Sequence, residues 1–198
     1  MPVAPRTAAW PGDEPFSCGW TLTKAQGASV NLGWAKTSPH VGTHVDAPYH
    51  YDDAGARVGG LALDAFVGPA LVVDARGAAE LDARLLRGLD LARAPRVLFR
   101  TRERNDPGTF DRDFPLLTGD ALQRLHDAGV RLVGIDAPSY DAFDSKDLPV
   151  HHALGQAGIA NVENLVLDGV EAGPYELLAA PVRWVDMDAA PLRALLRR

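Results

Sequence analysis

The sequence predicts an α/β fold with a mixed sheet, built as a single domain over residues 1–198. Three apolar runs at 70–74, 96–101 and 130–136 are typical of buried strands. Helical segments are expected between them, and this alternation of strands and helices favours parallel pairing in one α/β layer. With 198 residues, of which 46% are hydrophobic, the chain is long enough for one domain with a sizeable core.

The first third of the chain predicts little regular structure besides one hairpin. Residues 1–9 are rich in Pro and Ala, and we expect them to be loosely ordered. Patchy alternation of apolar residues over 17–37 predicts a β-hairpin. The polar, glycine-rich segment 51–60 indicates a loop, and 61–66 is long enough for one helical turn.

Helices and a long loop are expected around the second and third strands. Residues 81–91 indicate a helix or helical turns, and the charged segment 102–115 indicates a loop near the mouth of a site. Thr118 stands where it would cap a helix over 119–128.

The last quarter of the chain is expected to hold one helix, two strands and a basic tail. Pro149 would begin a helix over 150–158. Residues 164–168 and 175–180 read as strands, and 191–198 as a short turn of helix.

Charge and composition narrow the function classes. The net charge is −6, and no basic tract is present, which argues against nucleic acid or an anionic membrane surface as a partner. No apolar run approaches the ~20 residues of a membrane span, and the N-terminus lacks a signal-peptide core. Cys18 is the only cysteine, so an internal disulfide is excluded. These features predict a cytoplasmic protein.

One short stretch concentrates residues that bind metals. His40, His44, Asp46 and His50 fall within eleven residues of a chain that has six histidines. Imidazole and carboxylate groups together are typical ligands of Zn²⁺ and similar divalent ions. A histidine cluster of this density is a candidate metal site, although a lone histidine usually is not.

The spacing of this stretch requires a bend. On a straight strand His40 and His44 would lie about 13 Å apart, whereas two ligands of one zinc each approach the ion to about 2.0–2.1 Å. We therefore expect the chain to curl between them at Gly42, which tolerates the necessary backbone conformation. Pro48 predicts a further turn that carries His50 away from the other three side chains.

Four more polar residues are weaker candidates. His151 and His152 are adjacent, and Glu163 follows His151 by twelve residues. From spacing alone, a glutamate at this position is more often a surface residue in a salt bridge. Asp136 ends a predicted strand, where it could serve either a site or the capping of a loop.

The pattern His-x-Gly-Thr-His-x-Asp-x-Pro-x-His at 40–50 resembles the signature of the cyclase-like metal-dependent hydrolases. Within that family the chain is most similar to the bacterial kynurenine formamidases, also called arylformamidases. The segments 10–16, 134–139 and 151–163 also fit family positions. The resemblance covers nearly the whole chain and implies the swivelling β/β/α architecture of the family.

The resemblance implies a two-metal centre. His40, His44 and Asp46 would hold one ion, and Asp46 and Glu163 would bridge to a second ion that His151 also binds, with His152 as the alternative to His151. Oxygen and nitrogen ligands suit Zn²⁺ first and Mn²⁺ next.

The resemblance also implies the reaction. A metal-bound hydroxide would attack the formyl carbon of N-formyl-L-kynurenine, giving kynurenine and formate in tryptophan degradation. His50 would take a proton from the water and give it to the leaving amine. Trp10 would line the substrate pocket, although a tryptophan there is more often a core residue. A homodimer is implied, with pocket residues supplied by the partner.

Three other functions remain open at this point. A related hydrolase acting on a cyclic amide such as isatin, or on a lactone, would carry a similar metal centre. A non-catalytic metal-binding protein would use His50 as a structural ligand. A purely structural α/β protein would retain no stoichiometric metal.

Overall fold

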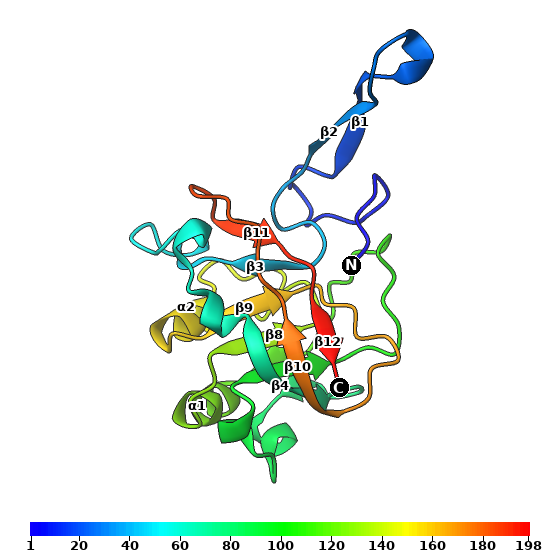
Figure 1. Ribbon diagram of the computed structural model, residues 1–198. Coiled ribbons are helices and arrows are strands. Elements are labelled where there is room, and N and C mark those ends of the chain that lie inside the picture. The colour runs from blue at the N-terminus through cyan, green and yellow to red at the C-terminus, as the bar shows by residue number, and fades with distance from the viewer.

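A curled sheet of eight strands forms the body of the molecule in the computed structural model, which describes residues 1–198 (Figure 1). Its inner strands pair in parallel and its outer strands pair antiparallel, so the predicted α/β class with a mixed sheet is confirmed. In spatial order the strands are β11 (Ala189–Pro191), β3 (His44–Asp46), β9 (Ala160–Glu163), β8 (Leu132–Ile135), β6 (Arg96–Arg100), β4 (Val67–Asp74), β10 (Gly173–Leu178) and β12 (Leu195–Arg197).

Two helices cover one face of this sheet. The helices α1 (Gly119–Asp127) and α2 (Pro149–Gln156) confirm the two helices predicted in these regions. Leu125 of α1 and Leu154 of α2 pack with Val97 and Phe99 of β6 in one buried cluster. Because side chains alternate along a strand, Leu98 faces the opposite side. No helix combines the length and the apolar character needed to cross a membrane.

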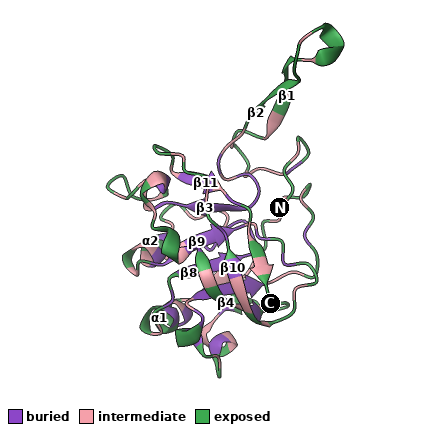
Figure 2. Cartoon of the chain, viewed as in Figure 1, coloured by how far each residue is buried: buried purple, intermediate pink, exposed green.

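The opposite face of the sheet curls around a second core. Val45 of β3 and Leu177 of β10 belong to the same buried cluster, although four strands separate β3 from β10 in the sheet. The strands are buried through most of the sheet, while the surface turns are exposed (Figure 2). The curl therefore buries a residue from each end of the sheet in one core.

The remaining elements are short. Two-residue strands β5 (Glu80–Leu81) and β7 (Leu116–Leu117) pair in parallel. The helical turns predicted over 61–66 and 81–91 are 3₁₀ turns. In full, the 3₁₀ turns are Lys24–Gln26, Pro48–His50, Val58–Gly60, Leu63–Ala65, Ala83–Leu86 and Leu91–Arg93.

The predicted hairpin forms an arm that projects from the body (Figure 1). It consists of β1 (Ser17–Leu22) and β2 (Leu32–Lys36), which pair antiparallel. Trp20 is 66% exposed and Trp34 is 49% exposed, and most of the arm is exposed along its length (Figure 2). The rest of the chain therefore leaves most of this arm uncovered. A two-stranded hairpin is only marginally stable in water by itself.

Two predicted elements of the C-terminal half are wrong. Residues 164–168 do not form a strand, because Asn164 adopts a left-handed backbone conformation (φ 54°) directly after β9 and ends it. The tail over 191–198 is not helical, because it supplies the end of β11 and all of β12 to the two edges of the sheet. The strand predicted over 175–180 is confirmed as β10.

The prediction of a loosely ordered N-terminal segment is also wrong. The Met1 ammonium group donates a hydrogen bond to Thr43 Oγ1 at 2.5 Å, and the backbone of Ala8 hydrogen-bonds that of Pro107. Thr7 is buried. These contacts attach residues 1–9 to the stretch at 40–50 and to the loop at 102–115, and composition alone does not predict them.

Candidate metal centre

The centre of the site is set by the pairing of β3 with β9. In this antiparallel pair His44 lies opposite Glu163, and Asp46 lies opposite Asn161. Directly opposed residues share a face of the sheet, and residues two apart on one strand also share it, so all four side chains fall on one face. All four are buried. The register therefore brings a histidine and two acidic groups together from distant parts of the sequence.

The predicted curl before β3 is confirmed. Gly42 has a φ of 79°, in the left-handed region that glycine adopts at no steric cost. The imidazole rings of His40 and His44 consequently lie 4.9 Å apart, centroid to centroid. A Cβ on Gly42 would stand 2.6 Å from Val3 Cγ2, so the N-terminal segment packs against this turn too closely for a larger side chain.

The prediction that Pro48 carries His50 away from the side chains of His40, His44 and Asp46 is wrong. Residues Pro48–His50 form a single 3₁₀ turn in which the His50 N–H donates to the Ala47 carbonyl at 2.8 Å. This turn folds the chain back, and the His50 ring lies 4.3 Å from the His40 ring. His50 therefore belongs to the same cluster and is the most solvent-accessible of its histidines, with 31% of its side chain exposed.

The helix α2 directs His151 into the site and His152 away from it. His151 is buried, and its Nε2 lies 3.2 Å from Glu163 Oε1 and 3.4 Å from Asp46 Oδ2. His152 is exposed, and its ring contacts that of Tyr51. Between the two adjacent histidines, the structure brings His151 to the cluster.

The spacing of the converging atoms fits a divalent ion. Two ligands of a tetrahedral zinc, each about 2.0–2.1 Å from it, lie about 3.3 Å apart. His40 Nδ1 and His44 Nε2 lie 3.0 and 3.2 Å from Asp46 Oδ1, and His44 Nε2 lies 3.6 Å from Glu163 Oε2. His44 Nε2 and Asp46 Oδ1 are also buried without a hydrogen-bond partner. Buried polar atoms without partners are costly, and a cation between them would satisfy both.

The potential ligand atoms fall into two groups that share Asp46. One group is His40, Asp46 and His50, and the other is His44, Asp46 and Glu163, with ligand atoms in each group within 4.8 Å of one another. A carboxylate common to two groups suits a pair of metal ions. This grouping differs from the predicted division of ligands between the two ions, which stays a prediction.

The two central carboxyl groups have opposite electrostatic shifts. Burial raises the pKa of Glu163, and the nearby Asp46 carboxylate raises it further. Burial also opposes ionisation of Asp46, but His44, His151 and His40 outweigh it and hold the pKa of Asp46 well below its usual range. In the metal-free chain burial and charge therefore favour protonation of Glu163 and ionisation of Asp46.

Flanking acids favour the protonated form of two histidines. Burial opposes protonation of His40, but the Asp188 and Asp46 carboxylates outweigh it and raise its pKa to about 10. Burial likewise opposes protonation of His151, while Asp141 and Asp46 raise its pKa well above the usual value. A metal ion entering the site must displace these protons.

The outer nitrogens of two histidines are fixed by hydrogen bonds. His44 Nδ1 donates to the Gly42 carbonyl at 2.9 Å, and His151 Nδ1 donates to Asp141 Oδ2 at 2.7 Å. Each bond leaves Nε2 facing the carboxyl groups of Asp46 and Glu163, where a metal ion that displaced any proton on Nε2 could bind it. Metal-binding histidines are typically oriented in this way by a second partner.

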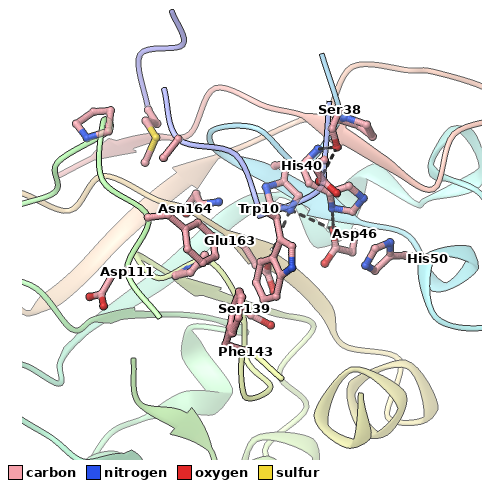
Figure 3. Close-up of a pocket in the computed structure, with 18 of the residues that line it drawn as sticks. Trp10, Ser38, His40, Asp46, His50, Asp111, Ser139, Phe143, Glu163 and Asn164 are labelled. Atoms are coloured by element: carbon pink, nitrogen blue, oxygen red, sulfur yellow. Dashed lines mark hydrogen bonds and ion pairs between the residues drawn. The ribbon is translucent and has the colours of Figure 1, made fainter. Parts of the chain in front are cut away.

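A cavity of about 510 Å³ opens beside the cluster. Trp10 stacks on Phe143 with centroids 5.1 Å apart, and its ring meets the edge of Phe110 at 5.2 Å. Figure 3 shows Trp10 over Phe143 in this cavity, with Asp46 and His50 to one side of the two rings. Phe110 belongs to the predicted loop at 102–115, so the expectation that this loop lies near the site mouth is confirmed.

Sequence reasoning missed three polar residues that contact the cluster. Asp188 Oδ2 lies 2.9 Å from His40 Nε2 and 3.2 Å from His50 Nδ1. Asp141 contacts His151, and Asn161 donates to Asp46 Oδ2 at 2.8 Å. None of the three stands in a recognisable local pattern, and only the fold places them here.

Asp136 does not join the cluster. Its carboxylate accepts hydrogen bonds from the Thr101 N–H, the Thr101 hydroxyl and the Arg102 N–H. These bonds join the ends of β6 and β8, so Asp136 caps a loop.

The sheet and the buried histidine and carboxylate cluster on its strands β3 and β9 define an α/β protein with a candidate di-metal site, the class that includes metal-dependent hydrolases. Residues 1–142 match the family described as "Putative cyclase". The chain belongs to this cyclase family.

Relatives within the family are similar over nearly the full length. A kynurenine formamidase of Salinibacter ruber is 48% identical over 98% of this chain and 93% of the relative. A kynurenine formamidase of Paracidovorax citrulli is 44% identical over 99% of this chain and 93% of the relative. A third, from Bacillus cytotoxicus, is 40% identical over 100% and 94% of the two chains.

Solved structures share the fold. A potential metal-dependent hydrolase with cyclase activity superposes with a TM-score of 0.84 at 29% identity, covering 99% of this chain and 94% of that one. Isatin hydrolase A from Labrenzia aggregata superposes with a TM-score of 0.78 at 24% identity, covering 99% and 88%. The second likeness extends to the fold alone.

We expect Zn²⁺ to raise the midpoint of thermal unfolding, and to raise it more at about pH 8.5 than at about pH 6.5. The pKa of His40 is about 10 in the folded chain, above its value of 6.5 in the unfolded chain. Protonated His40 therefore stabilises the metal-free fold fully below pH 6.5, and this stabilisation is lost as the pH rises toward 10. Protons compete with zinc over the same window, so zinc binding strengthens as pH rises. Free zinc at a hundred times its Kd would add about 2.7 kcal/mol. Thermal scans with and without zinc measure the difference.

The matched control for this expectation is Asp46→Asn, which removes the carboxylate that both groups share. The zinc-dependent rise should largely disappear in this variant. An equal rise in Asp46→Asn and the unmodified chain would contradict a site centred on Asp46.

Proposed function

We propose that this protein is an arylformamidase that hydrolyses N-formyl-L-kynurenine to L-kynurenine and formate. The observation that carries the proposal is the full-length similarity to bacterial kynurenine formamidases at 40–48% identity. The cavity supports it, because an aromatic wall stands beside a candidate metal centre. An aryl amide is the kind of substrate that such a pocket would hold.

We assign the metal-holding role to five residues. His40, His44 and Asp46 would hold one Zn²⁺, and Asp46, Glu163 and His151 a second, with Mn²⁺ as the next candidate metal. When bound, such ions lower the pKa of water to about 7 and polarise a carbonyl oxygen. What supports the assignment is the 3.0–3.6 Å spacing of the converging atoms.

We assign the proton transfers to His50. Its ring borders the cavity beside His40 and is more exposed than the buried histidines, so it can reach both a water and a substrate. His50 would accept a proton from the attacking water as the formyl carbon becomes tetrahedral. It would then donate that proton to the aryl amine nitrogen as the C–N bond breaks, because an arylamide anion is a poor leaving group.

We assign binding of the substrate's aryl ring to Trp10. The indole ring is half-buried and is held by Phe143 and Phe110 rather than by the core. Offset stacking between aromatic rings contributes about 0.5–1.5 kcal/mol beyond burial. This wall would orient the aryl ring so that the formyl group points toward the histidine and carboxylate cluster.

A substrate panel tests the proposed reaction. Zinc-loaded protein is assayed by ultraviolet absorbance with N-formyl-L-kynurenine, isatin and a simple lactone. We expect kcat/KM to be highest for N-formyl-L-kynurenine by at least tenfold. A higher kcat/KM for isatin or the lactone would contradict the proposal and indicate one of the related hydrolases that share this fold. Stoichiometric zinc without turnover of any substrate would indicate a metal-binding protein.

His50→Ala should lower kcat for N-formyl-L-kynurenine by about 10²–10⁴-fold, the usual contribution of a general acid or base. Zinc content, measured by elemental analysis, should stay at the level of the unmodified protein. His152→Ala is the matched control, because that histidine is exposed and directed away from the cluster. Near-normal turnover in His50→Ala would refute the role assigned to His50.

We propose that the working protein is a homodimer in which the arm packs on the partner. The arm exposes five large apolar side chains, Trp20, Leu22, Val30, Leu32 and Trp34, each at least 45% exposed. Trp20 lies opposite Gly33 and Trp34 lies opposite Gly19, so the two tryptophans are on opposite faces of the arm. Several large apolar side chains exposed close together are typical of a protein interface. The arm also connects directly to the stretch that carries His40, so the partner would lie close to the cavity.

The double substitution Trp20→Ser and Trp34→Ser should shift the protein from dimer to monomer at micromolar concentration, because it removes the two largest apolar groups of the arm. Sedimentation equilibrium measures the mass. Leu63→Ser is the control, since Leu63 is also exposed (59%) but lies outside the arm. A dimer of unchanged stability in the double variant would exclude the arm as the interface.

A further inference from the structure

We propose that Asp188 is a positioning residue that orients the imidazole rings of both His40 and His50 through one carboxylate oxygen. The inference rests on the proposed function, because it gives those two histidines their tasks. Asp188 Oδ2 lies 2.9 Å from His40 Nε2 and 3.2 Å from His50 Nδ1. One oxygen therefore joins a proposed metal ligand to the proposed general acid and base.

The backbone around Asp188 is held firmly in place. The Asp188 carbonyl accepts a hydrogen bond from the Ala47 N–H at 2.8 Å, and the Met187 carbonyl accepts one from the Val58 N–H at 3.0 Å. Asp188 then leads directly into β11, where Ala189 pairs with Asp46. The carboxylate is thus anchored to the same strand that carries Asp46, so its distance from the cluster is fixed by the sheet.

A carboxylate accepts hydrogen bonds and cannot donate them, which decides where each ring keeps its proton. With its proton on Nε2 toward Asp188, a neutral His40 presents the Nδ1 lone pair, and Nδ1 lies 3.0 Å from Asp46 Oδ1 in the cluster. With its proton on Nδ1 toward Asp188, His50 leaves its Nε2 lone pair free to accept a proton from water. The same oxygen therefore prepares one ring to bind metal and the other to act as a base.

This arrangement gives His50 a role other than metal binding. The His40, Asp46 and His50 group has the proximity that a three-residue metal site requires. However, Asp188 occupies His50 Nδ1, and His50 is the most exposed histidine of the cluster. An imidazole held by a carboxylate at one nitrogen and open at the other is the arrangement of a general base in a catalytic triad.

Two readouts on the zinc-loaded, full-length protein test the proposal. Long-range ¹⁵N–¹H correlation spectra report which ring nitrogen of each histidine carries the proton, with His50→Ala used to assign the signals. Steady-state assays with N-formyl-L-kynurenine report kcat and KM separately. We expect His50 to carry its proton on Nδ1 in the unmodified protein.

In Asp188→Asn we expect a mixture of His50 tautomers, because the amide can donate as well as accept. We expect kcat to fall at least tenfold with KM within about twofold, and zinc affinity to fall about 10–100-fold, as for other groups that orient metal-binding histidines. Asp186→Asn is the matched control, because it is an exposed aspartate on the same segment, and it should leave all these quantities unchanged.

Asp188→Ala provides a second test if the asparagine variant does not fold, and circular dichroism establishes folding in each case. A His50 proton on Nε2 in the unmodified protein would overturn the proposal. The same conclusion would follow from an unchanged tautomer and kcat in a folded Asp188 variant. If the unmodified protein fails to hydrolyse N-formyl-L-kynurenine, the proposed function fails, while the spectra still decide whether Asp188 orients the two rings.

Discussion

The antiparallel pairing of β3 with β9 is the constraint on which the site depends. It sets His44 opposite Glu163 and Asp46 opposite Asn161, on one buried face. A slip of one residue would turn Asp46 and Glu163 to opposite sides of the sheet, because side chains alternate along a strand. The pairing is protected on both sides, since β11 continues the sheet beyond β3 and β8 continues it beyond β9.

Burial of the β3–β9 face costs free energy, because this face carries two carboxyl groups. Asp46 and Glu163 are both almost fully buried, and each approaches the Nε2 of His44 and of His151. Buried charges persist in proteins only when they are paired or coordinate a metal. The fold supplies partial compensation through protonated histidines and through Asn161, and a divalent ion would complete it. The same electrostatic demand therefore accounts for the pKa shifts and for the fit to a metal.

The buried cluster and the wall of the cavity come from different elements. Strands and a helix place His44, Asp46, Glu163 and His151, whereas turns and loops place the groups around the cavity. Loops presented by a rigid scaffold commonly carry the residues that contact substrate. The short segment that ends at Asp188 joins the two parts, because it is bonded to Ala47 and Val58 by its backbone and to two histidines by its side chain.

The sequence by itself determined the features that depend on neighbouring residues: the apolar strands, the helices α1 and α2, the hairpin, and the curl at Gly42. It also marked the dense cluster from His40 to His50, and the resemblance to the family predicted His151 and Glu163 as its distant partners. Only the tertiary structure decided that β9 ends at Glu163, that the tail closes both edges of the sheet, and that Asp141 and Asp188 reach the histidines. Short strands and single aspartates carry too little local preference to be recognised, because their positions are set by pairing with segments far away in the chain.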